Sequence, residues 1–216
     1  MVDRAQRKAR TRAAILGAAR DRFVQQGFAG TTIRDVARAA GVSVGTIHAH
    51  FSDKQGLLMA CFHHQIGHAV ELGLETVDPT APLAHQLTHL ARVLYAAYAR
   101  HPALSREMFV ASLFPESHAD PNFERFLVEL AALYRAALHR GELTRLPEGG
   151  MLAAHGWFSA YLITLIGGLA GTMGDPGAPE APAIQALAFR RLLVVQLVGL
   201  GADPSLLAPP NPAVSP

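Results

Sequence analysis

An all-α fold is what this sequence predicts, and three observations point to it. Ala and Leu dominate the chain, while the alternation of apolar and polar residues that marks strands is nearly absent. Apolar residues instead recur at helical spacing in successive segments, which proline- or glycine-rich breaks separate. Half of the 216 residues are hydrophobic, enough for a substantial core. We therefore expect about nine helices, in a three-helix head followed by a helical bundle.

The first helix is expected over residues 11–26. Apolar side chains repeat there at helical spacing, namely Ile15, Leu16, Ala19 and Phe23. Gly27 then supplies a C-terminal stop. The basic stretch before this helix, residues 1–9, is expected to be a flexible arm.

Residues 31–58, TTIRDVARAAGVSVGTIHAHFSDKQGLL, predict two short capped helices, a tight turn between them and the start of a third helix. Thr32 fits an N-cap, and Asp35 three residues later completes a capping box. Gly41 is suited to the left-handed conformation of a sharp turn, and Ser43 caps the next helix. This arrangement predicts a helix-turn-helix, which places one short helix in the major groove of DNA.

The rest of the chain also has helical periodicity. Further helices are expected over residues 53–77, 83–100, 103–114, 122–140, 151–173 and 183–201. The last residues, 203–216, hold five prolines and no helical pattern, so we expect a disordered tail. The predicted organisation is thus an arm over 1–9, a helix-turn-helix domain over 10–56, a helical domain over 57–202 and the tail.

Basic residues are concentrated at the N-terminal end. Residues 1–60 carry ten Lys and Arg against four acids, a charge of +6, whereas the remaining residues sum to −4. A basic first quarter on an acidic body suits a polyanionic partner bound at one end. The arm either follows the minor groove beside the bound helix or adds only non-specific attraction.

The chain has one cysteine, Cys61, so no disulfide can form within it. This fits a reducing compartment, and the charged N-terminus lacks the apolar core of a secretory signal. An ordinary packed cysteine is a better interpretation of Cys61 than a redox sensor. We expect a cytoplasmic protein.

Residues 151–173 contain no Asp, Glu, Lys or Arg and are long enough to span a bilayer. No second comparable stretch is expected, and flanking charge is sparse. We favour a helix buried at an interface between subunits, where Gly167 and Gly171 allow close backbone approach. The mean hydropathy of +0.19 also indicates such an interface. No membrane partner is expected.

The helix-turn-helix also predicts which side chains face DNA. Its small core needs apolar residues, and these are Val36, Ala37, Val42, Ile47 and Phe51. The exposed face of the third helix is left to Val44, Gly45, Thr46, His48, Ala49 and His50. Lys54, early in the next helix, is within reach of a phosphate.

The pattern closely resembles the TetR family of bacterial transcriptional repressors over about residues 10–58. The residues that carry the resemblance are Gly27-Phe28, Thr31 through Ala37, Ala40 through Ile47, His50-Phe51, Lys54 and Leu57-Leu58. Beyond Leu58 the resemblance lies in total length, helix number and a hydrophobic final helix pair.

The resemblance implies a set of DNA contacts. Thr32 and Arg34 would contact DNA from the second helix, and Ser43, Thr46, His50 and Lys54 would hold phosphates. Val44, Gly45 and Ala49 stand where family members vary to read bases. His48 stands where the family usually has Tyr, and Val44 where it often has Lys. With Val44 and Ala49 apolar, readout is expected to rely on thymine methyl groups.

The resemblance also implies a ligand chamber in the C-terminal helices. Aromatic and sulfur-containing side chains that would line it are Tyr95, Tyr98, Met108, Phe109, Phe126, Tyr134, Trp157 and Tyr161. Each of them fits equally well as a core residue at helical spacing. Together they favour a small hydrophobic or aromatic effector, and no other cofactor is expected.

A dimer interface is implied for the last two long helices, which would pair with their symmetry mates in a four-helix bundle. The residues expected there are Phe158, Leu162, Leu165, Gly168, Phe189, Leu193, Leu197 and Leu200. Two heads on a two-fold axis require a palindromic operator.

Metal binding and catalysis find little support. His64 and His68 stand four residues apart with Glu71 nearby, which is only a weak candidate for a metal site. There is no phosphate-binding glycine loop and no nucleophile motif, so no enzyme is expected.

The expected function is a ligand-responsive regulator of transcription, a repressor that a small molecule releases from its operator. One alternative is an activator or constitutive regulator without a ligand. The other is a helical ligand-binding or enzymatic module with a vestigial head.

Overall fold

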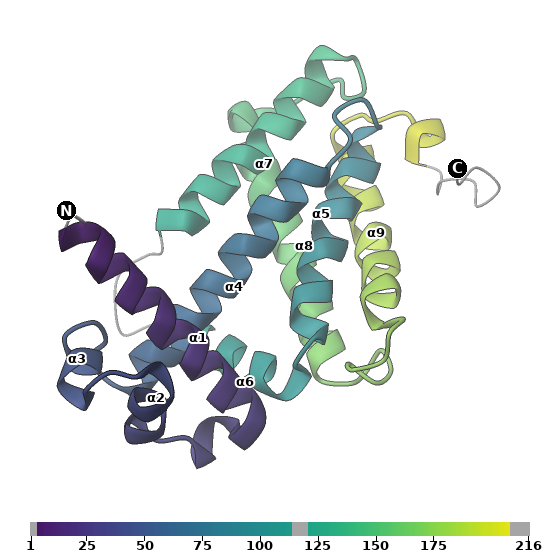
Figure 1. The fold of residues 1–216 in the computed structure, drawn as a ribbon. Coiled ribbons are helices and arrows are strands. Elements are labelled where there is room, and N and C mark those ends of the chain that lie inside the picture. The colour runs from purple at the N-terminus through teal and green to yellow at the C-terminus, as the bar shows by residue number, and fades with distance from the viewer. Residues whose placement is uncertain (1–3, 114–120, 208–216) are drawn as a thin grey trace. The chain divides into compact units, whose positions relative to one another are not determined.

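The computed structural model describes residues 4–113 and 121–207, in which every regular element is a helix (Figure 1). The α-helices are α1 Arg4–Gly30, α2 Ile33–Ala40, α3 Val44–His48, α4 Lys54–Thr76, α5 Leu83–Ala99, α6 Pro102–Leu113, α7 Pro121–His139, α8 Met151–Leu169 and α9 Ala181–Gly199. Two short 3-10 helices, η1 Pro147–Gly150 and η2 Pro204–Leu207, complete the described part. The prediction of an all-α fold is confirmed.

The two ends differ most from what the sequence pattern indicated. Helix α1 begins at Arg4, so most of the expected flexible arm is helical, while residues 1–3 lie outside the described residues. Arg, Lys, Gln and Ala are all strong helix formers, and they extend α1 without an apolar stripe. In the expected tail, Pro204–Leu207 is a 3-10 helix, and residues 208–216 lie outside the described residues.

The chain divides into two compact units. Among the described residues, the first unit holds residues 4–67 and 101–113, and the second holds 68–100 and 121–207. The sequence placed this division after residue 56, with α6 in the C-terminal domain. Helix α6 instead joins the first unit because Leu104 and Met108 are buried in its core.

The first unit is built on one apolar core. Its buried residues from α1 to α3 and the joint after α3 are Ile15, Leu16, Ala19, Phe23, Val36, Ala37, Ile47 and Phe51, with Leu57, Leu58 and Cys61 from α4. The stripe predicted for α1 therefore faces inward. Burial raises the pKa of the Cys61 thiol to about 12, and its Sγ faces the Leu16 carbonyl at 3.6 Å. These surroundings are those of a packed cysteine.

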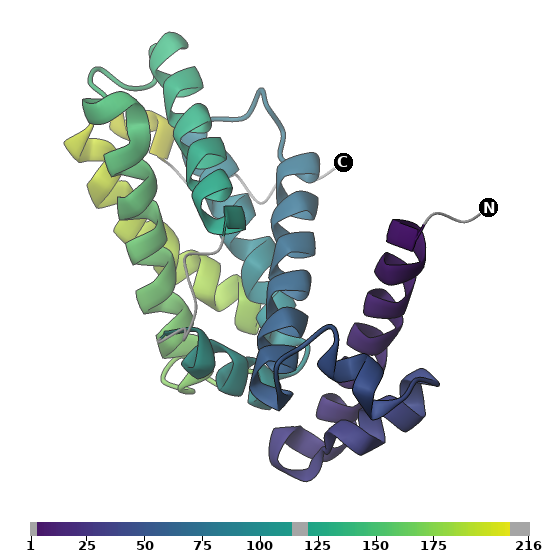
Figure 2. The same cartoon turned by 90° about the vertical axis from the view of Figure 1, so that its left-hand side faces the viewer.

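The second unit packs α5 against α9, and α8 against both α7 and α9 (Figures 1 and 2). Its largest fully buried side chains are Trp157, Tyr95, Tyr134 and Phe189. The α8–α9 contact is close: a Cβ atom on Gly168 would meet the Gln185 side chain, and one on Gly156 would stand 2.5 Å from Gln196 Nε2. Glycines therefore allow close helix approach inside one chain.

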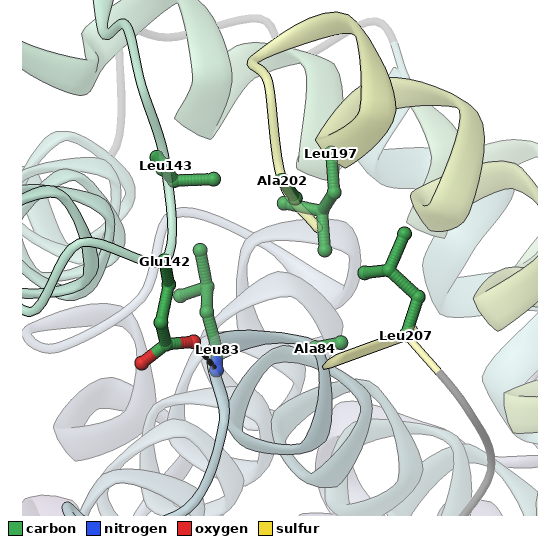
Figure 3. Close-up of a pocket in the computed structure, with 7 residues that line it drawn as sticks. All are labelled: Leu83, Ala84, Glu142, Leu143, Leu197, Ala202 and Leu207. Carbon is green, nitrogen blue, oxygen red and sulfur yellow. Dashed lines mark hydrogen bonds between the residues drawn. The ribbon is translucent and has the colours of Figure 1, made fainter. Parts of the chain in front are cut away.

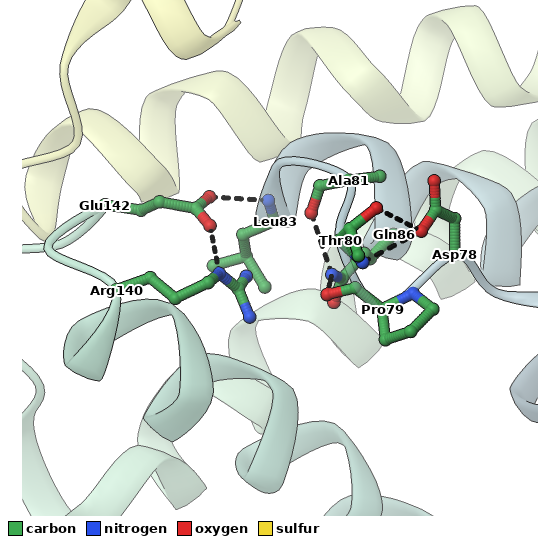
Figure 4. Close-up of polar contacts among 8 residues, drawn as sticks. All are labelled: Asp78, Pro79, Thr80, Ala81, Leu83, Gln86, Arg140 and Glu142. Atoms are coloured by element: carbon green, nitrogen blue, oxygen red, sulfur yellow. Dashed lines mark hydrogen bonds and ion pairs between the residues drawn. The ribbon is translucent and has the colours of Figure 1, made fainter.

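A polar corner fixes the start of α5 (Figure 4). Glu142 follows α7 and accepts a hydrogen bond from the Leu83 backbone N–H at 2.6 Å and another from Arg140 Nε at 2.6 Å. Gln86 Nε2 donates to the carbonyls of Pro79 and Ala81, which closes the turn before α5. A carboxylate thus satisfies the first turn of α5, which Pro82 leaves without a side-chain cap.

A small, mostly apolar recess lies beside this corner (Figure 3). It is lined by Leu83, Ala84, Glu142, Leu143, Leu197, Ala202 and Leu207. The buried Arg190 donates to the Leu207 carbonyl at 2.6 Å, which fixes η2 against α9. The recess therefore includes part of the segment that the sequence assigned to a disordered tail.

Within residues 4–113 and 121–207, two helical segments are long and apolar enough to cross a bilayer by length and composition, Pro147–Leu169 and Ala181–Gly199. The expectation of only one such stretch was therefore wrong. In these segments, 44% and 39% of the most apolar window is buried inside the protein. Helices in the cores of soluble proteins have this same property, so the two segments do not indicate a membrane protein.

Candidate nucleic-acid interface

Helix α2 begins at the predicted capping box. Thr32 Oγ1 accepts a hydrogen bond from the Asp35 backbone N–H at 3.2 Å, and the Asp35 carboxylate accepts from the Thr32 N–H at 3.1 Å. The Thr32 hydroxyl also donates to the carboxylate at 2.5 Å. These bonds hold the pKa of Asp35 below its ordinary value, and the side-chain hydrogen bond from Thr32 has the largest effect. The N-cap and the capping box are confirmed.

The turn between α2 and α3 depends on Gly41. Its φ of 65° and ψ of 32° lie in the left-handed region, as predicted. The next residue, Val42, donates its N–H to the Ala37 carbonyl at 3.0 Å. The chain can therefore reverse within two residues and begin α3 at a fixed angle to α2.

Helix α3 is capped by Ser43, whose Oγ accepts from the Thr46 N–H at 3.0 Å and lies 2.8 Å from Thr46 Oγ1. Its only fully buried side chain is Ile47, which packs in the core of the first unit. Phe51 follows the helix and is also buried. These inward contacts fix which face of α3 is presented to solvent.

The outward face of α3 holds the predicted DNA-contacting residues. Val44, Gly45, His48 and Ala49 are exposed, Ser43 is exposed at the cap, and Thr46 and His50 are half-buried. On α2, Thr32 and Arg34 are exposed as well. The structure therefore brings nine of the ten predicted contacts onto the surface of one helix-turn-helix without a buried charge among them.

The two histidines have local contacts at the end of α3. His48 Nδ1 lies 3.3 Å from the Ser52 carbonyl, and the His50 ring centroid is 6.2 Å from that of Phe51. Both side chains remain accessible from solvent. The His48 imidazole thus takes the place at which the sequence resemblance expects a phenol.

Lys54 is placed differently from the other predicted contacts. Its Nζ donates to the Phe28 carbonyl at 2.8 Å and to the Thr31 carbonyl at 3.1 Å, and lies 4.2 Å from the Phe28 ring centroid. Two of its three protons therefore bind carbonyls near the end of α1, where a cation is favourable. The structure gives Lys54 a role in joining α1 to α4, which the sequence did not indicate.

The predicted ligand-lining residues are all buried, but they belong to different places. Met108 and Phe109 lie on α6 in the first unit, and Met108 is part of its core. The remaining residues lie in the second unit, as Tyr95 and Tyr98 from α5, Phe126 and Tyr134 from α7, and Trp157 and Tyr161 from α8.

Three of these rings form a stack. The ring centroid of Tyr161 lies 5.1 Å from that of Tyr95 and 5.3 Å from that of Trp157, and the ring planes are nearly parallel. Burial raises the pKa of the Tyr95, Tyr98 and Tyr161 hydroxyls, so all three phenols are neutral. Tyr134 lies apart and donates to Gln196 Oε1 at 3.1 Å. The three stacked rings thus pack against one another in the core of the second unit.

The predicted interface residues are mostly turned inward. Leu165, Gly168, Phe189, Leu193 and Leu197 are buried within the chain, whereas Phe158, Leu162 and Leu200 are half-buried. The apolar side chains that α8 and α9 expose are Leu152, Ile163, Ile166, Ile184, Leu187, Leu192, Val195 and Val198. Helices without a distinct polar face do not reveal from sequence which stripe faces the core.

For metal binding, the described residues contain no group of three or more His, Cys, Asp or Glu side chains that could hold an ion. The weak candidates His64, His68 and Glu71 do not come together as such a group. The site defined by geometry is therefore a helix-turn-helix surface.

The segment that forms this surface is similar to known proteins. Residues 15–61 match the family model described as bacterial regulatory proteins, tetR family. The transcriptional regulator TtgR from Pseudomonas putida is 37% identical over 86 residues, which cover 38% of this chain and 41% of TtgR. The repressor AcnR from Corynebacterium diphtheriae is 28% identical over 115 residues, 53% of this chain and 54% of AcnR. The chain thus matches about half of these curated relatives or less.

Solved structures extend the likeness to the whole fold. A TetR-family transcriptional regulator from Pectobacterium atrosepticum aligns with a TM-score of 0.67 at 21% identity, covering 92% of this chain and 97% of its own. FadR from Bacillus subtilis, solved in complex with stearoyl-CoA, aligns with a TM-score of 0.56 at 17% identity, covering 84% and 97%. Residues 15–61 of the head thus match the tetR family model, and the resemblance seen in the sequence is confirmed over this segment.

Proposed function

We propose that this chain is a ligand-responsive transcriptional regulator that binds a palindromic DNA operator through α3. One observation carries the proposal: a capped helix-turn-helix turns Val44, Gly45, His48 and Ala49 outward while Ile47 anchors it in the core. The relatives named as regulators and as a repressor support it. Repression is our preferred mode, and no catalytic step is part of the proposal.

The proposal requires two heads, and the second unit offers a surface for pairing. Helices α8 and α9 expose apolar side chains in one neighbourhood, of which Val195 is 73% exposed and Ile163 is 59% exposed. Isolated apolar residues on a surface are ordinary, but eight on two packed helices form a patch. We propose that a second copy of the chain covers this patch, because a symmetric pair presents two identical helices to a palindrome.

The effector is proposed to be a small hydrophobic or aromatic molecule that binds the second unit. The aromatic side chains of Tyr95, Trp157 and Tyr161, stacked in this unit, favour flat or apolar chemistry over a charged sugar. FadR from Bacillus subtilis, which shares the fold, was solved with stearoyl-CoA. Helix α4 continues from the first unit into the second, and a ligand that prefers one arrangement of the two would shift the population bound to DNA.

DNA binding is tested by selecting duplexes from a random pool with the purified protein and measuring binding against competitor DNA. We expect a palindromic sequence in which each half-site contains A·T pairs. Arg34→Ala is expected to weaken binding at least tenfold, while Arg38→Ala on the same helix is the matched control and changes it little. Failure to prefer any duplex would overturn the proposal.

Pairing is tested separately by sedimentation. The wild-type chain is expected to be a dimer, and Val195→Glu is expected to give a monomer that binds DNA weakly. Val128→Glu, on an exposed apolar residue of α7, is the control and is expected to leave the dimer intact. Ile163→Glu is tested in the same way. If the dimer persists with Val195→Glu and with Ile163→Glu, the interface lies elsewhere.

The effector is tested with a panel of acyl chains and planar aromatic compounds. A ligand raises the melting temperature by mass action, and an inducer of the proposed kind also releases the selected duplex. A compound that stabilises the protein without releasing DNA would favour a regulator with another response. Absence of any stabilising compound would favour the constitutive alternative.

A further inference from the structure

The first turns of α1 carry a cationic surface that the helix-turn-helix does not include. Residues 4–12 are helical, and no acid occurs in the described chain before Asp21. We call this surface the basic face, and it consists of Arg4, Arg7, Lys8, Arg10 and Arg12, all of them exposed. At roughly 100° per residue Arg4, Arg7, Lys8 and Arg12 lie on one side of the helix, Arg10 stands at the edge of that side, and Ala5, Gln6, Ala9 and Ala13 occupy the other.

This charge arrangement is unfavourable for an isolated helix. Arg4, Lys8 and Arg12 are spaced four residues apart, so like charges are neighbours along one row. They also lie at the N-terminal end of α1, where the helix dipole is positive and the first turn has no acidic residue. A polyanion that supplies counter-charges would relieve both repulsions.

The row begins beside the recognition helix. The Arg12 guanidinium carbon lies 5.0 Å from the Phe51 ring centroid, and the His50 ring contacts the same phenylalanine. Phe51 lies three residues after the end of α3 and donates its N–H to the Ile47 carbonyl at 2.8 Å. From this point α1 runs toward its N-terminus, beyond α2 and α3, in both views of the ribbon (Figures 1 and 2).

We propose that the basic face is a second contact with the duplex that α3 reads, made to phosphates outside the recognised bases. This inference rests on the proposed function. From Arg4 to Arg12 the helix rises roughly 12 Å, which corresponds to about three or four base pairs. A helix about 10–12 Å wide does not enter a minor groove about 6 Å wide, so the contacts are with the backbone.

Charge complementarity and continuity with the helix-turn-helix identify DNA as the partner. Phosphate contacts release counterions, so each lost contact makes the dependence of affinity on salt less steep by about 0.9 in a log–log plot. The double variant Arg4→Gln/Lys8→Gln removes two cations per chain and keeps good helix formers. Binding of two chains therefore predicts a slope that is shallower by about two to four.

The experiment uses the full-length chain and the duplex that the protein itself selects from a random pool. That duplex is prepared in two lengths, one trimmed to the shortest palindrome that is bound and one extended by several base pairs on each side. We expect the wild-type protein to bind the extended duplex more tightly and Arg4→Gln/Lys8→Gln to bind both alike. Arg100→Gln/Arg125→Gln, which removes the same charge from exposed residues of the second unit, is the matched control and keeps the wild-type slope.

A third variant tests whether the helical form matters. Ala9→Pro keeps all five cations but interrupts α1 about one and a half turns from its start. We expect it to lose as much salt dependence as Arg4→Gln/Lys8→Gln, and circular dichroism checks that the rest of the protein stays folded. An unchanged slope for Ala9→Pro would show that a flexible arm suffices and would overturn the proposal.

The other outcomes separate the two proposals. If the wild-type chain selects no duplex, the proposed function itself fails. If it selects one but Arg4→Gln/Lys8→Gln keeps the wild-type slope and length preference, only the basic face is excluded. An equal loss in the control double variant would attribute the effect to net charge and would also overturn this inference.

Discussion

The side-chain amide of Gln196 on α9 occupies the space directly over Gly156 on α8. Gln196 Nε2 donates to the Ala153 carbonyl at 2.6 Å, and its Oε1 accepts from the Tyr134 hydroxyl at 3.1 Å. A Cβ atom on Gly156 would stand 2.5 Å from Nε2. One glutamine thus joins three helices of the second unit, and it can do so only because residue 156 has no side chain.

Gly156→Ala is therefore expected to destabilise the protein although alanine favours helices. Displacing Gln196 strains the packing and breaks its hydrogen bonds, at a cost of about 1–3 kcal/mol. Thermal unfolding measures the loss, and Gly17→Ala is the control, because nothing lies within 4 Å of a Cβ there. That control is expected to gain up to about 1 kcal/mol. A stabilised Gly156→Ala protein would contradict the contact between α8 and α9 described above.

Lys54→Met is expected to lower the stability of the first unit by about 1–3 kcal/mol, because two carbonyls lose a charged donor. Thermal unfolding and the salt dependence of DNA binding are measured together. Arg38→Met, whose side chain is 81% exposed, is the control and is expected to stay within about 0.5 kcal/mol of wild type. Unchanged stability with a shallower salt dependence would instead make Lys54 the phosphate contact that the sequence resemblance implies.

Local signals made the helix-turn-helix predictable from the sequence. A cap such as Thr32 binds a residue three positions away, and the left-handed turn at Gly41 depends on one residue, so short stretches contain the whole cause. The role of Lys54 could not be predicted in this way, because its partner Phe28 is 26 residues earlier and the bond depends on how α1 packs against α4.

Which side of α8 and α9 faces the core could not be predicted from the sequence, for a different reason. Leu193 is fully buried and Val195 is 73% exposed, yet both are apolar residues of α9, whose polar residues do not mark the outward face because Gln185 and Arg190 are themselves buried. Hydrophobic periodicity identifies an inward stripe only when the opposite stripe is polar. The same limit applies to the aromatic residues: the sequence gives their helical spacing, while the stack of Tyr95, Tyr161 and Trp157 comes from three-dimensional packing.

Asp35 makes the stability of the first unit depend on pH. Hydrogen bonds from Thr32 lower the pKa of this carboxyl in the folded protein, so the charged form is the one that stabilises. The contribution of the charged carboxylate to stability is complete at pH values above the ordinary carboxyl pKa. It is lost as the pH falls through the lowered pKa of Asp35 in the folded protein. Unfolding of wild type and Asp35→Asn is compared across this range by circular dichroism. The difference between them is expected to be largest near neutral pH and to shrink below about pH 4; a constant difference would contradict the linkage.

Ser43 allows the capping role to be separated from the proposed phosphate contact. Its Oγ accepts the Thr46 N–H, and both Asn and Asp replace serine well at an N-cap. Ser43→Asn and Ser43→Asp are therefore expected to melt close to wild type, whereas Ser43→Ala is expected to lose about 0.5–2 kcal/mol. On the selected duplex, Ser43→Asp is expected to bind far more weakly than Ser43→Asn, because a carboxylate repels the DNA backbone. Equal binding by these two variants would place Ser43 away from the phosphates and restrict it to holding α3 in place.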